Sequence, residues 1–149
     1  MGEIASFSLV WKGDQVNAQT RNAMRWGIDS TMADCVTTAC DRVPVGTTSF
    51  LKGSLKMHPA VDNVDNITGY WGSFDIKYAP FVEFGTRPHW PPVDAIAKSM
   101  KVDRSTAFLI ARAISRYGTR PHPYLIPAAE AHYPSLSHRI AAQIEWGTS

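Results

Sequence analysis

A short segment that occurs twice most constrains how this chain can fold. Residues 84–91 read FGTRPHWP and residues 117–124 read YGTRPHPY, so the same core of five residues returns 33 positions later. Glycine adopts a positive φ without steric cost, while each proline fixes its own φ and keeps the preceding arginine extended. Each copy is therefore predicted to end a helix, at Gly85 or at Gly118, and to continue as a stiff, extended arm.

Length and composition predict a single folded domain. A chain of 149 residues buries roughly 70% of its unfolded surface on folding. The hydrophobic fraction of 44% and the charged fraction of 19% are typical of a folded protein and not of a disordered one. No low-complexity linker separates two halves, so we expect residues 1–149 to form one domain.

The charge of the chain argues against a dedicated nucleic-acid-binding domain. The net charge is +2 and the pI is about 8.6, whereas such domains concentrate more Lys and Arg than this. The first residues carry neither a basic n-region nor a long apolar run. We therefore expect no signal peptide and no membrane span, and we expect synthesis in the cytosol.

The two cysteines, Cys35 and Cys40, lie five residues apart in a segment predicted to be helical. At 1.5 Å and 100° per residue, their Cα atoms are roughly 8 Å apart and face different directions, which is too far for a disulfide. We expect both thiols to stay free, as in a reducing compartment.

The N-terminal part is predicted to form a strand and a long helix. Residues 4–11 alternate loosely, as in a short strand, and Asp14 is the expected helix N-cap. Between residues 15 and 42 only Gly27 disfavours a helix, and Pro44 ends it. The small side of this helix would lie close to a sheet or a partner helix; it holds Val16, Ala23, Gly27, Thr31, Cys35 and Ala39, and Met24, Ile28, Met32 and Val36 widen the apolar stripe.

The rest of the chain is predicted to add a small antiparallel sheet and shorter helices. A hairpin is expected with strands at residues 54–58 and 67–77, and one face of its second strand would hold Tyr70, Gly72, Phe74 and Ile76. Helical segments are expected at residues 49–55, 78–84, 91–100, from Asp103 or Ser105 to 117, and 128–146, the last one kinked or divided at Pro134. The predicted fold class is therefore α+β, with a long N-terminal helix packed on a small antiparallel sheet, additional C-terminal helices and extended proline-rich arms.

The sequence favours no catalytic, metal or cofactor site. His89 and His122 occur in the repeated segments, but neither has a second ligand two to five residues away, and zinc requires three or four. No nucleophile elbow and no phosphate-binding glycine loop is present, and the cysteines fall within a helix, where thiols are usually inert. We therefore expect no enzyme activity.

Arginines and large aromatic residues remain as candidates for binding. Arginines gather in the second half of the chain, and we favour helix capping and a solvated face for them over contact with the DNA backbone; they are Arg87, Arg104, Arg112, Arg116 and Arg120. Trp71, Trp90, Tyr124 and Trp146 are either core or interface anchors. Trp90 and Tyr124 stand beside prolines, and a rigid backbone loses little entropy on docking, so these two suit an interface better.

Three segments, in this order, resemble a known family. Its first element is resembled by residues 43–47, VPVGT, followed by residues 51–55, LKGSL. Residues 46–50, GTTSF, depart from the Asp-Thr-Gly that the family usually carries at this place. Residues 78–86, YAPFVEFGT, are very close to its central element, and residues 120–128, RPHPYLIPA, resemble its closing element. Together they are similar to the neck or tail-completion proteins of long-tailed bacteriophages, a group that includes the minor tail protein Z type.

The resemblance implies a structural virion protein without catalysis, made in the host cytoplasm. It would complete the tail and join it to the DNA-filled head, as a single domain with a helical insertion at about residues 91–117. We expect a ring-forming adaptor that binds copies of itself, six-fold as a first guess and twelve-fold as a second, and other neck and tail proteins. The alternatives are a tail terminator or head-closure protein, a DNA-contacting channel protein, and a small hydrolase.

The two arms are expected to act as two separate grips in such a ring. Residues 87–92 and 120–127 would supply one binding patch, and the apolar surface of residues 70–84 would supply part of the other. The residues expected at protein interfaces are Phe81, Glu83, Phe84, Arg87, His89, Trp90, Arg120, His122, Tyr124 and Leu125.

Overall fold

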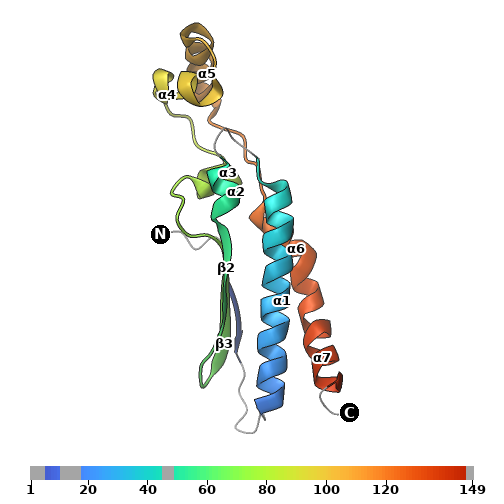
Figure 1. Ribbon diagram of the computed structural model, residues 1–149. Coiled ribbons are helices and arrows are strands. Elements are labelled where there is room, and N and C mark those ends of the chain that lie inside the picture. Colours follow the sequence, from blue (N-terminus) through green and yellow to red (C-terminus); the bar gives the residue numbers. More distant parts are fainter. Residues whose placement is uncertain (1–5, 11–17, 45–48, 147–149) are drawn as a thin grey trace.

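The computed structural model describes residues 6–10, 18–44 and 49–146, and it confirms the α+β class. The body is elongated, and a pair of helices projects from one end of it (Figure 1). Along the chain the elements are β1 (Ser6–Val10), α1 (Ala18–Arg42), α2 (Phe50–Ser54), β2 (Leu55–Asp62), β3 (Asn66–Ser73), α3 (Ala79–Phe84), α4 (Val93–Met100), α5 (Arg104–Tyr117), α6 (Leu125–His132), the 3-10 turn η1 (Tyr133–Ser135) and α7 (Leu136–Trp146).

The sheet has three antiparallel strands in the order β1-β3-β2. The predicted hairpin is present, but β2 is longer than expected and β3 ends at Ser73. The N-terminal strand pairs with β3, with Leu9 opposite Ile67. The register of β2 against β3 shifts between His58 and Val61, and there the amide N–H of Ala60 donates to the Asp29 carboxylate at 2.7 Å. An acid on α1 therefore holds the bulge in place.

The face of β3 that packs on the core is the one opposite to the face named from the sequence. Ile67, Gly69 and Trp71 face the core, whereas Tyr70 is half-buried and Phe74 and Ile76 lie beyond the end of the strand. Side chains of α1 fill the space over Gly69, where an added Cβ would lie 2.5 Å from Met32 Cε and 2.9 Å from Ile28 Cγ2. The face that packs on the core is thus the one where Gly69 leaves room for α1. The alternation of residues along the strand does not reveal this.

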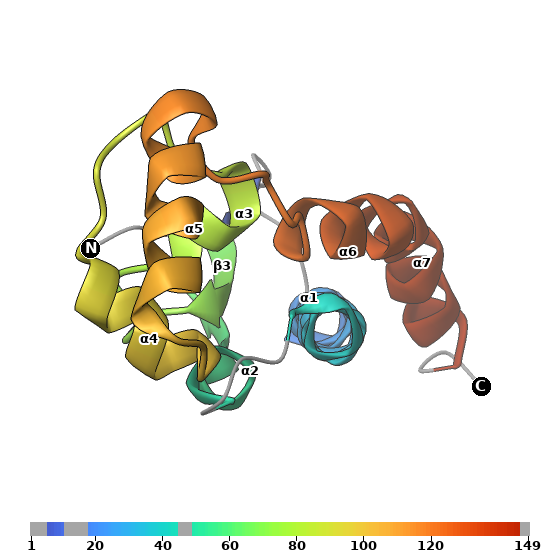
Figure 2. The same cartoon turned by 90° about the horizontal axis from the view of Figure 1, so that it is seen from above.

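Helix α1 is the middle of three layers, between the sheet and the pair α6–α7 (Figure 2). Its larger apolar residues face the sheet, and its small side faces α6 and α7, which is the second of the two predicted alternatives, a sheet or a partner helix. A Cβ added to Gly27 would lie 2.5 Å from Ile140 Cγ1 on α7, and the Cys35 thiol donates to the Ala128 carbonyl at 3.7 Å. Cys35 and Cys40 are both free, as predicted. The predicted cap Asp14 and the first stripe position, Val16, lie outside the described residues.

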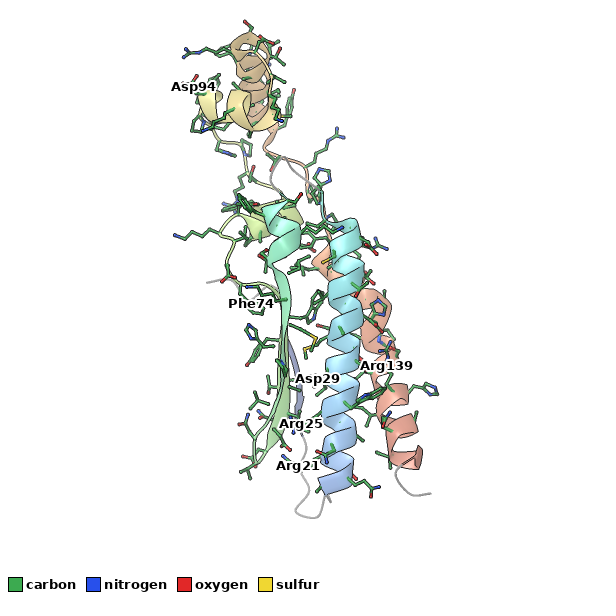
Figure 3. The ribbon with its side chains drawn as sticks, viewed as in Figure 1. Arg21, Arg25, Asp29, Phe74, Asp94 and Arg139 are labelled. Carbon is green, nitrogen blue, oxygen red and sulfur yellow. The ribbon has the colours of Figure 1, made fainter. Side chains whose placement is uncertain are left out.

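The C-terminal helix is divided where Pro134 predicts. The 3-10 turn η1 separates α6 from α7, and Tyr133 within it accepts a hydrogen bond from Nε1 of the fully buried Trp71 at 2.9 Å. Helix α7 is tied to α1 by the Arg139–Asp34 ion pair, and Figure 3 shows Arg139 on the side of α7 near α1. The side chain of Trp146, predicted to be a core or interface anchor, lies outside the described ones.

Helices α4 and α5 form a helical hairpin that projects from the body. Lys101 ends α4 in the left-handed region, with φ 53°, and the Asp103 carboxylate caps α5 by accepting the Thr106 amide at 3.0 Å. The hairpin has its own small core, which centres on Ile96, Ala107 and Ala111 and shares no residue with the core of the body. Helix α5 runs across the long axis of α1, since Figure 2 shows α1 end-on and α5 from the side.

Candidate protein–protein interface

The two copies of the repeated segment lie against each other at the base of the helical hairpin. Thr86 and Thr119 form an antiparallel bridge, in which each amide donates to the other's carbonyl, at 3.2 and 3.3 Å. Their hydroxyl groups are also hydrogen-bonded, at 3.0 Å. We call residues 85–87 and 118–120 together the clasp. The copies thus form one structure, which corrects the interpretation as two separate grips.

Two glycines make this close approach possible. Gly85 and Gly118 have φ values of 73° and 72°, as predicted from the Gly that ends each preceding helix. A Cβ on Gly85 would collide with the Thr119 carbonyl oxygen, and one on Gly118 would collide with the Thr86 carbonyl oxygen. Each glycine therefore allows a positive φ at its own position and leaves room for the backbone of the opposite copy.

Glu83 fastens the second arm to the body. Its side chain comes from the end of α3 and is 1% exposed. The carboxylate accepts three amide N–H groups at the start of α6, from Tyr124 and Leu125 at 2.7 and 2.9 Å and from Ile126 at 2.9 Å. These donors have no partner within the helix, and the N-terminal end of a helix favours a negative charge, so the burial of Glu83 is compensated.

Three of the ten predicted interface residues lie in the interior of the protein. Glu83 is buried as the cap of α6, and Tyr124 and Leu125 are each 0% exposed in the core of the body. The side chain of Tyr124 is held there because Glu83 accepts a hydrogen bond from the backbone N–H of Tyr124. Burial, and then the charge of Glu83, raise the pKa of the Tyr124 hydroxyl well above its usual value. These three residues therefore position the arm and are not exposed for a partner.

The other seven predicted residues lie on the surface around the clasp. Phe81, Phe84 and Trp90 are 57%, 60% and 54% exposed, which is unusual for such large apolar side chains in one region. The polar members, also exposed, are Arg87, His89, Arg120 and His122. The arms that carry them are fixed: His89 Nδ1 lies 2.9 Å from the Arg87 carbonyl, and the His122 amide donates to the Val82 carbonyl at 2.8 Å.

An open, mostly apolar cleft of about 510 Å³ lies against the first arm. It is lined by Phe81, Gly85, Thr86, Arg87, Pro88 and His89. Five of these six residues come from the repeated segment before its tryptophan, so the clasp itself shapes one wall. An aromatic or aliphatic side chain of a partner would fit such a cleft, with Arg87 available for an acidic group beside it.

Several exposed apolar residues of the helical hairpin were not among the predicted interface residues. Phe108 and Leu109 stand on α5 and Tyr117 ends it, and all three are exposed. The Trp90 ring packs edge-on against the Phe108 ring, with centroids 5.7 Å apart, so the first arm continues onto α5. Residues 104–117 carry apolar side chains on two faces of the helix. The second apolar face is the sequence pattern from which these exposed residues could have been predicted.

Within residues 6–10, 18–44 and 49–146, no group of three His, Cys, Asp or Glu side chains is arranged to hold a metal ion. The same described residues include no helix that is both long and apolar enough to cross a bilayer. What the site offers is a rigid, exposed surface of aromatic side chains, arginines and histidines, which is the composition of protein interfaces. Comparison with protein-family models, with curated proteins and with solved structures finds no match to this chain.

Proposed function

We propose that this chain is a structural virion protein of a phage neck, which completes the tail and joins it to the DNA-filled head as a ring-forming adaptor. The proposal starts from the resemblance of three segments to the neck and tail-completion family. It assigns the chain no reaction, and its place in the finished virion would be the neck.

The observation that carries the proposal is the contact between Glu83 and the start of α6. Glu83 belongs to the central motif segment, residues 78–86, and its three amide partners belong to the closing segment, residues 120–128. The two segments that most resemble the family are thus the two halves of one structural unit. This gives a physical reason for a glutamate in one segment and for the short N-terminal turn of α6 in the other. It supports the proposal that this chain shares its fold with that family.

The surface around the clasp supports a role in assembly. Phe81, Phe84 and Trp90 are more than half exposed, and they stand on backbone that prolines and the clasp hold rigid. Rigid aromatic side chains lose little conformational entropy when they dock, so such a surface favours a stable complex. A closed ring of identical subunits needs two different patches on each subunit, and the surface around the clasp is the first of them.

The direct test is to delete the gene from the phage or prophage that carries it and to image the lysate by electron microscopy. The proposal expects full heads and finished tails that are not joined. Overlong or unfinished tails would instead assign the chain to tail termination, the alternative within the same neck. Normal virions would refute both.

A second test measures assembly of the purified protein by sedimentation velocity and native mass spectrometry. A closed oligomer is expected, with six subunits as the first guess and twelve as the second. Replacing Trp90 and Phe84 with Ser should lower both the oligomer fraction and the yield of joined particles, while Val64→Ser in the β2–β3 turn, where Val64 is 90% exposed, should change neither. A protein that stays monomeric and a deletion that still joins heads to tails would together refute the proposal.

A further inference from the structure

The two arms place their arginines on the same face of the clasp. Thr86 and Thr119 share the opposite face, since their hydroxyl groups are hydrogen-bonded to each other at 3.0 Å. Arg87 and Arg120 each follow one of these threonines and precede a proline, which keeps the arginine extended. Because side chains alternate between the two faces of extended backbone, both arginines lie on the face away from the threonines.

Glycines leave this arginine face open. In the antiparallel register of the bridge, Gly118 is opposite Arg87 and Gly85 is opposite Arg120, so neither arginine has a side chain directly across from it. The two arginines are diagonal neighbours, at a spacing of roughly 7–8 Å that long side chains can span. We call Arg87 and Arg120 the arginine pair.

The arginine pair has no acidic partner in the part of the chain that the structure describes. Both residues are exposed, and neither side chain is in an ion pair there. Residues 84–92 and 117–127 contain no Asp or Glu. Glu83, the nearest acid in the sequence, is 1% exposed, and its carboxylate accepts three amides at the start of α6. Two guanidinium groups on rigid backbone are therefore available to acidic groups from outside.

The surroundings of the arginine pair also favour an acidic partner. Residues 86–120 carry seven Lys or Arg and two Asp, a net charge of +5. At the end of the body next to the clasp (Figure 1), Asp41 is followed directly by exposed Arg42, and Lys52 on α2 is exposed as well. A negatively charged segment is therefore attracted toward the clasp from both the hairpin and the body.

The cleft beside Arg87 favours a protein segment over a nucleic acid. Its lining includes Phe81 and Pro88, and also Gly85, which is opposite Arg120. A phosphate backbone would engage the arginine pair but leave this mostly apolar cleft of about 510 Å³ empty. A peptide segment engages both when it carries a bulky apolar side chain beside its acids.

This chain does not contain such a segment itself. No two of its acidic residues are less than three positions apart, and the closest two are Asp62 and Asp65. Asp62 is ion-paired with Arg21, and Asp65 also acts on the charge of that arginine. The acidic segment therefore belongs to another protein and not to a second copy.

We propose that the arginine pair and the adjoining cleft bind an extended acidic segment of a different neck or tail protein, with carboxylates at positions i and i+2 and a bulky apolar side chain beside them. Residues i and i+2 of an extended segment lie on one face, about 6.6–6.8 Å apart. This distance matches the diagonal spacing of the arginine pair. Phe84 and Trp90 do not line the cleft, so they stay available for contacts between copies. The inference rests on the proposed function, for which it names the chemistry of the partner.

The probe is the peptide acetyl-Phe-Ser-Glu-Ser-Glu-amide, titrated into the full-length protein. Binding is followed by the backbone NMR signals of Gly85, Thr86, Gly118 and Thr119, and saturable shifts are expected at peptide concentrations up to about 5 mM. Replacing both Glu of the peptide with Gln should raise the dissociation constant by ~10-fold or more, and so should replacing its Phe with Ala.

Variants of the protein test each part of the site. Arg87→Gln/Arg120→Gln should weaken binding of the probe by ~10-fold or more, and Arg87→Lys/Arg120→Lys by less, because lysine keeps the charge but not the planar fork. The control, Lys98→Gln/Arg112→Gln, removes the same charge from exposed positions of the hairpin. It should change the dissociation constant by less than ~2-fold. Phe81→Ala should weaken binding of the Phe peptide but not of the Ala peptide, since both changes remove one contact.

Four results would overturn the inference. The first two are the absence of saturable shifts at the clasp and an equal affinity for the Gln peptide. The third is a short DNA duplex that shifts the same signals at lower concentration than the probe does, which would assign the arginine pair to phosphate groups. The fourth is loss of the native oligomer in Arg87→Gln/Arg120→Gln while circular dichroism shows a folded protein, which would assign the pair to contacts between copies.

Failure of this inference is distinguishable from failure of the proposed function. The peptide titration reports only on the chemistry that the clasp recognises. The neck function stands, whatever the titration gives, if the deletion phage yields full heads and finished tails that are not joined.

Discussion

Thr86 and Thr119 each donate a backbone N–H to the carbonyl oxygen of the other, although 33 positions separate them along the chain. Because the same five residues, GTRPH, include both threonines, the bridge is two-fold symmetric in sequence and in its two backbone hydrogen bonds, and the Thr119 amide also donates to the Thr86 hydroxyl at 3.1 Å. Each glycine leaves room for the backbone of the opposite copy. The repeat is therefore explained by a local pairing, and it requires neither a solenoid nor a metal site.

Substitution of a clasp glycine should destabilise the protein. Gly118→Ala places a Cβ at φ 72° and against the Thr86 carbonyl oxygen, and we expect a loss of about 1–3 kcal/mol in the free energy of unfolding by urea. Gly53→Ala is the matched control, because Gly53 is helical and a Cβ there meets nothing within 4 Å. That control should be neutral or slightly stabilising, and an equal loss in both variants would contradict the clasp.

Neutralising the cap of α6 should loosen the second arm. Glu83→Gln removes a buried charge that accepts three amides, and the expected cost is about 2–3 kcal/mol in urea unfolding. Hydrogen exchange of the Tyr124 to Ile126 amides should accelerate more than that of α7. Glu130→Gln, the same change at an exposed position of α6, should stay within about 0.5 kcal/mol of the native protein.

The buried hydroxyl of Tyr124 should contribute nothing to stability. Among the described residues it has no hydrogen-bond partner, so Tyr124→Phe removes the cost of burying it. We expect a stability between unchanged and about 1 kcal/mol higher by thermal and urea unfolding. Tyr133→Phe is the contrast, since it removes the acceptor of the Trp71 Nε1–H, and it should cost about 1 kcal/mol. A clear loss in Tyr124→Phe would mean that the hydroxyl is partnered in solution.

Acid should weaken the tie between the start of α1 and the sheet. The hydrogen bond from Arg21 lowers the pKa of the Asp62 carboxyl below its usual value. A lowered folded-state pKa stabilises the fold above the unfolded value of about 4, and this contribution is lost as pH falls through the folded pKa. The urea midpoints of native protein and Asp62→Asn should therefore differ at pH 7 and converge toward pH 2.5. Arg21→Gln should converge likewise, and a constant difference across this range would contradict the assignment.

The body should fold without the helical hairpin. Arg87 and Gly118 flank the Thr86–Thr119 bridge, so replacing residues 88–117 with Asn-Gly leaves a two-residue turn that suits a tight hairpin. Because the two cores share no residue, we expect cooperative unfolding with a smaller urea m-value and the blue-shifted emission of buried Trp71. Loss of cooperativity would show that the body depends on the hairpin.

Local patterns in the sequence predicted most of the elements. Pro44 and Pro134 marked helix ends, Gly85 and Gly118 took the positive φ expected of them, and the small side of α1 faced a helix. These features depend on residues close together in the sequence, where backbone restrictions decide the outcome.

Long-range contacts were not predictable in the same way. Glu83 appeared to be a surface residue because its partners start 41 residues later, and Tyr124 appeared to be an interface residue because proline neighbours do not reveal burial. The sequence did not indicate which face of β3 packs on the core, because both of its faces carry apolar residues. Which one packs depends on Gly69 lying under α1.

The bulge in β2 also affects whether two molecules can associate through the edge of the sheet. Pro59 has no amide hydrogen, and the Ala60 amide is bound to Asp29, so two successive positions on this edge of the sheet offer no free donor to an incoming strand. This interrupts the row of backbone donors that an added strand would need along β2. An exposed strand edge is a common route to uncontrolled aggregation, and here one proline and one aspartate interrupt that edge.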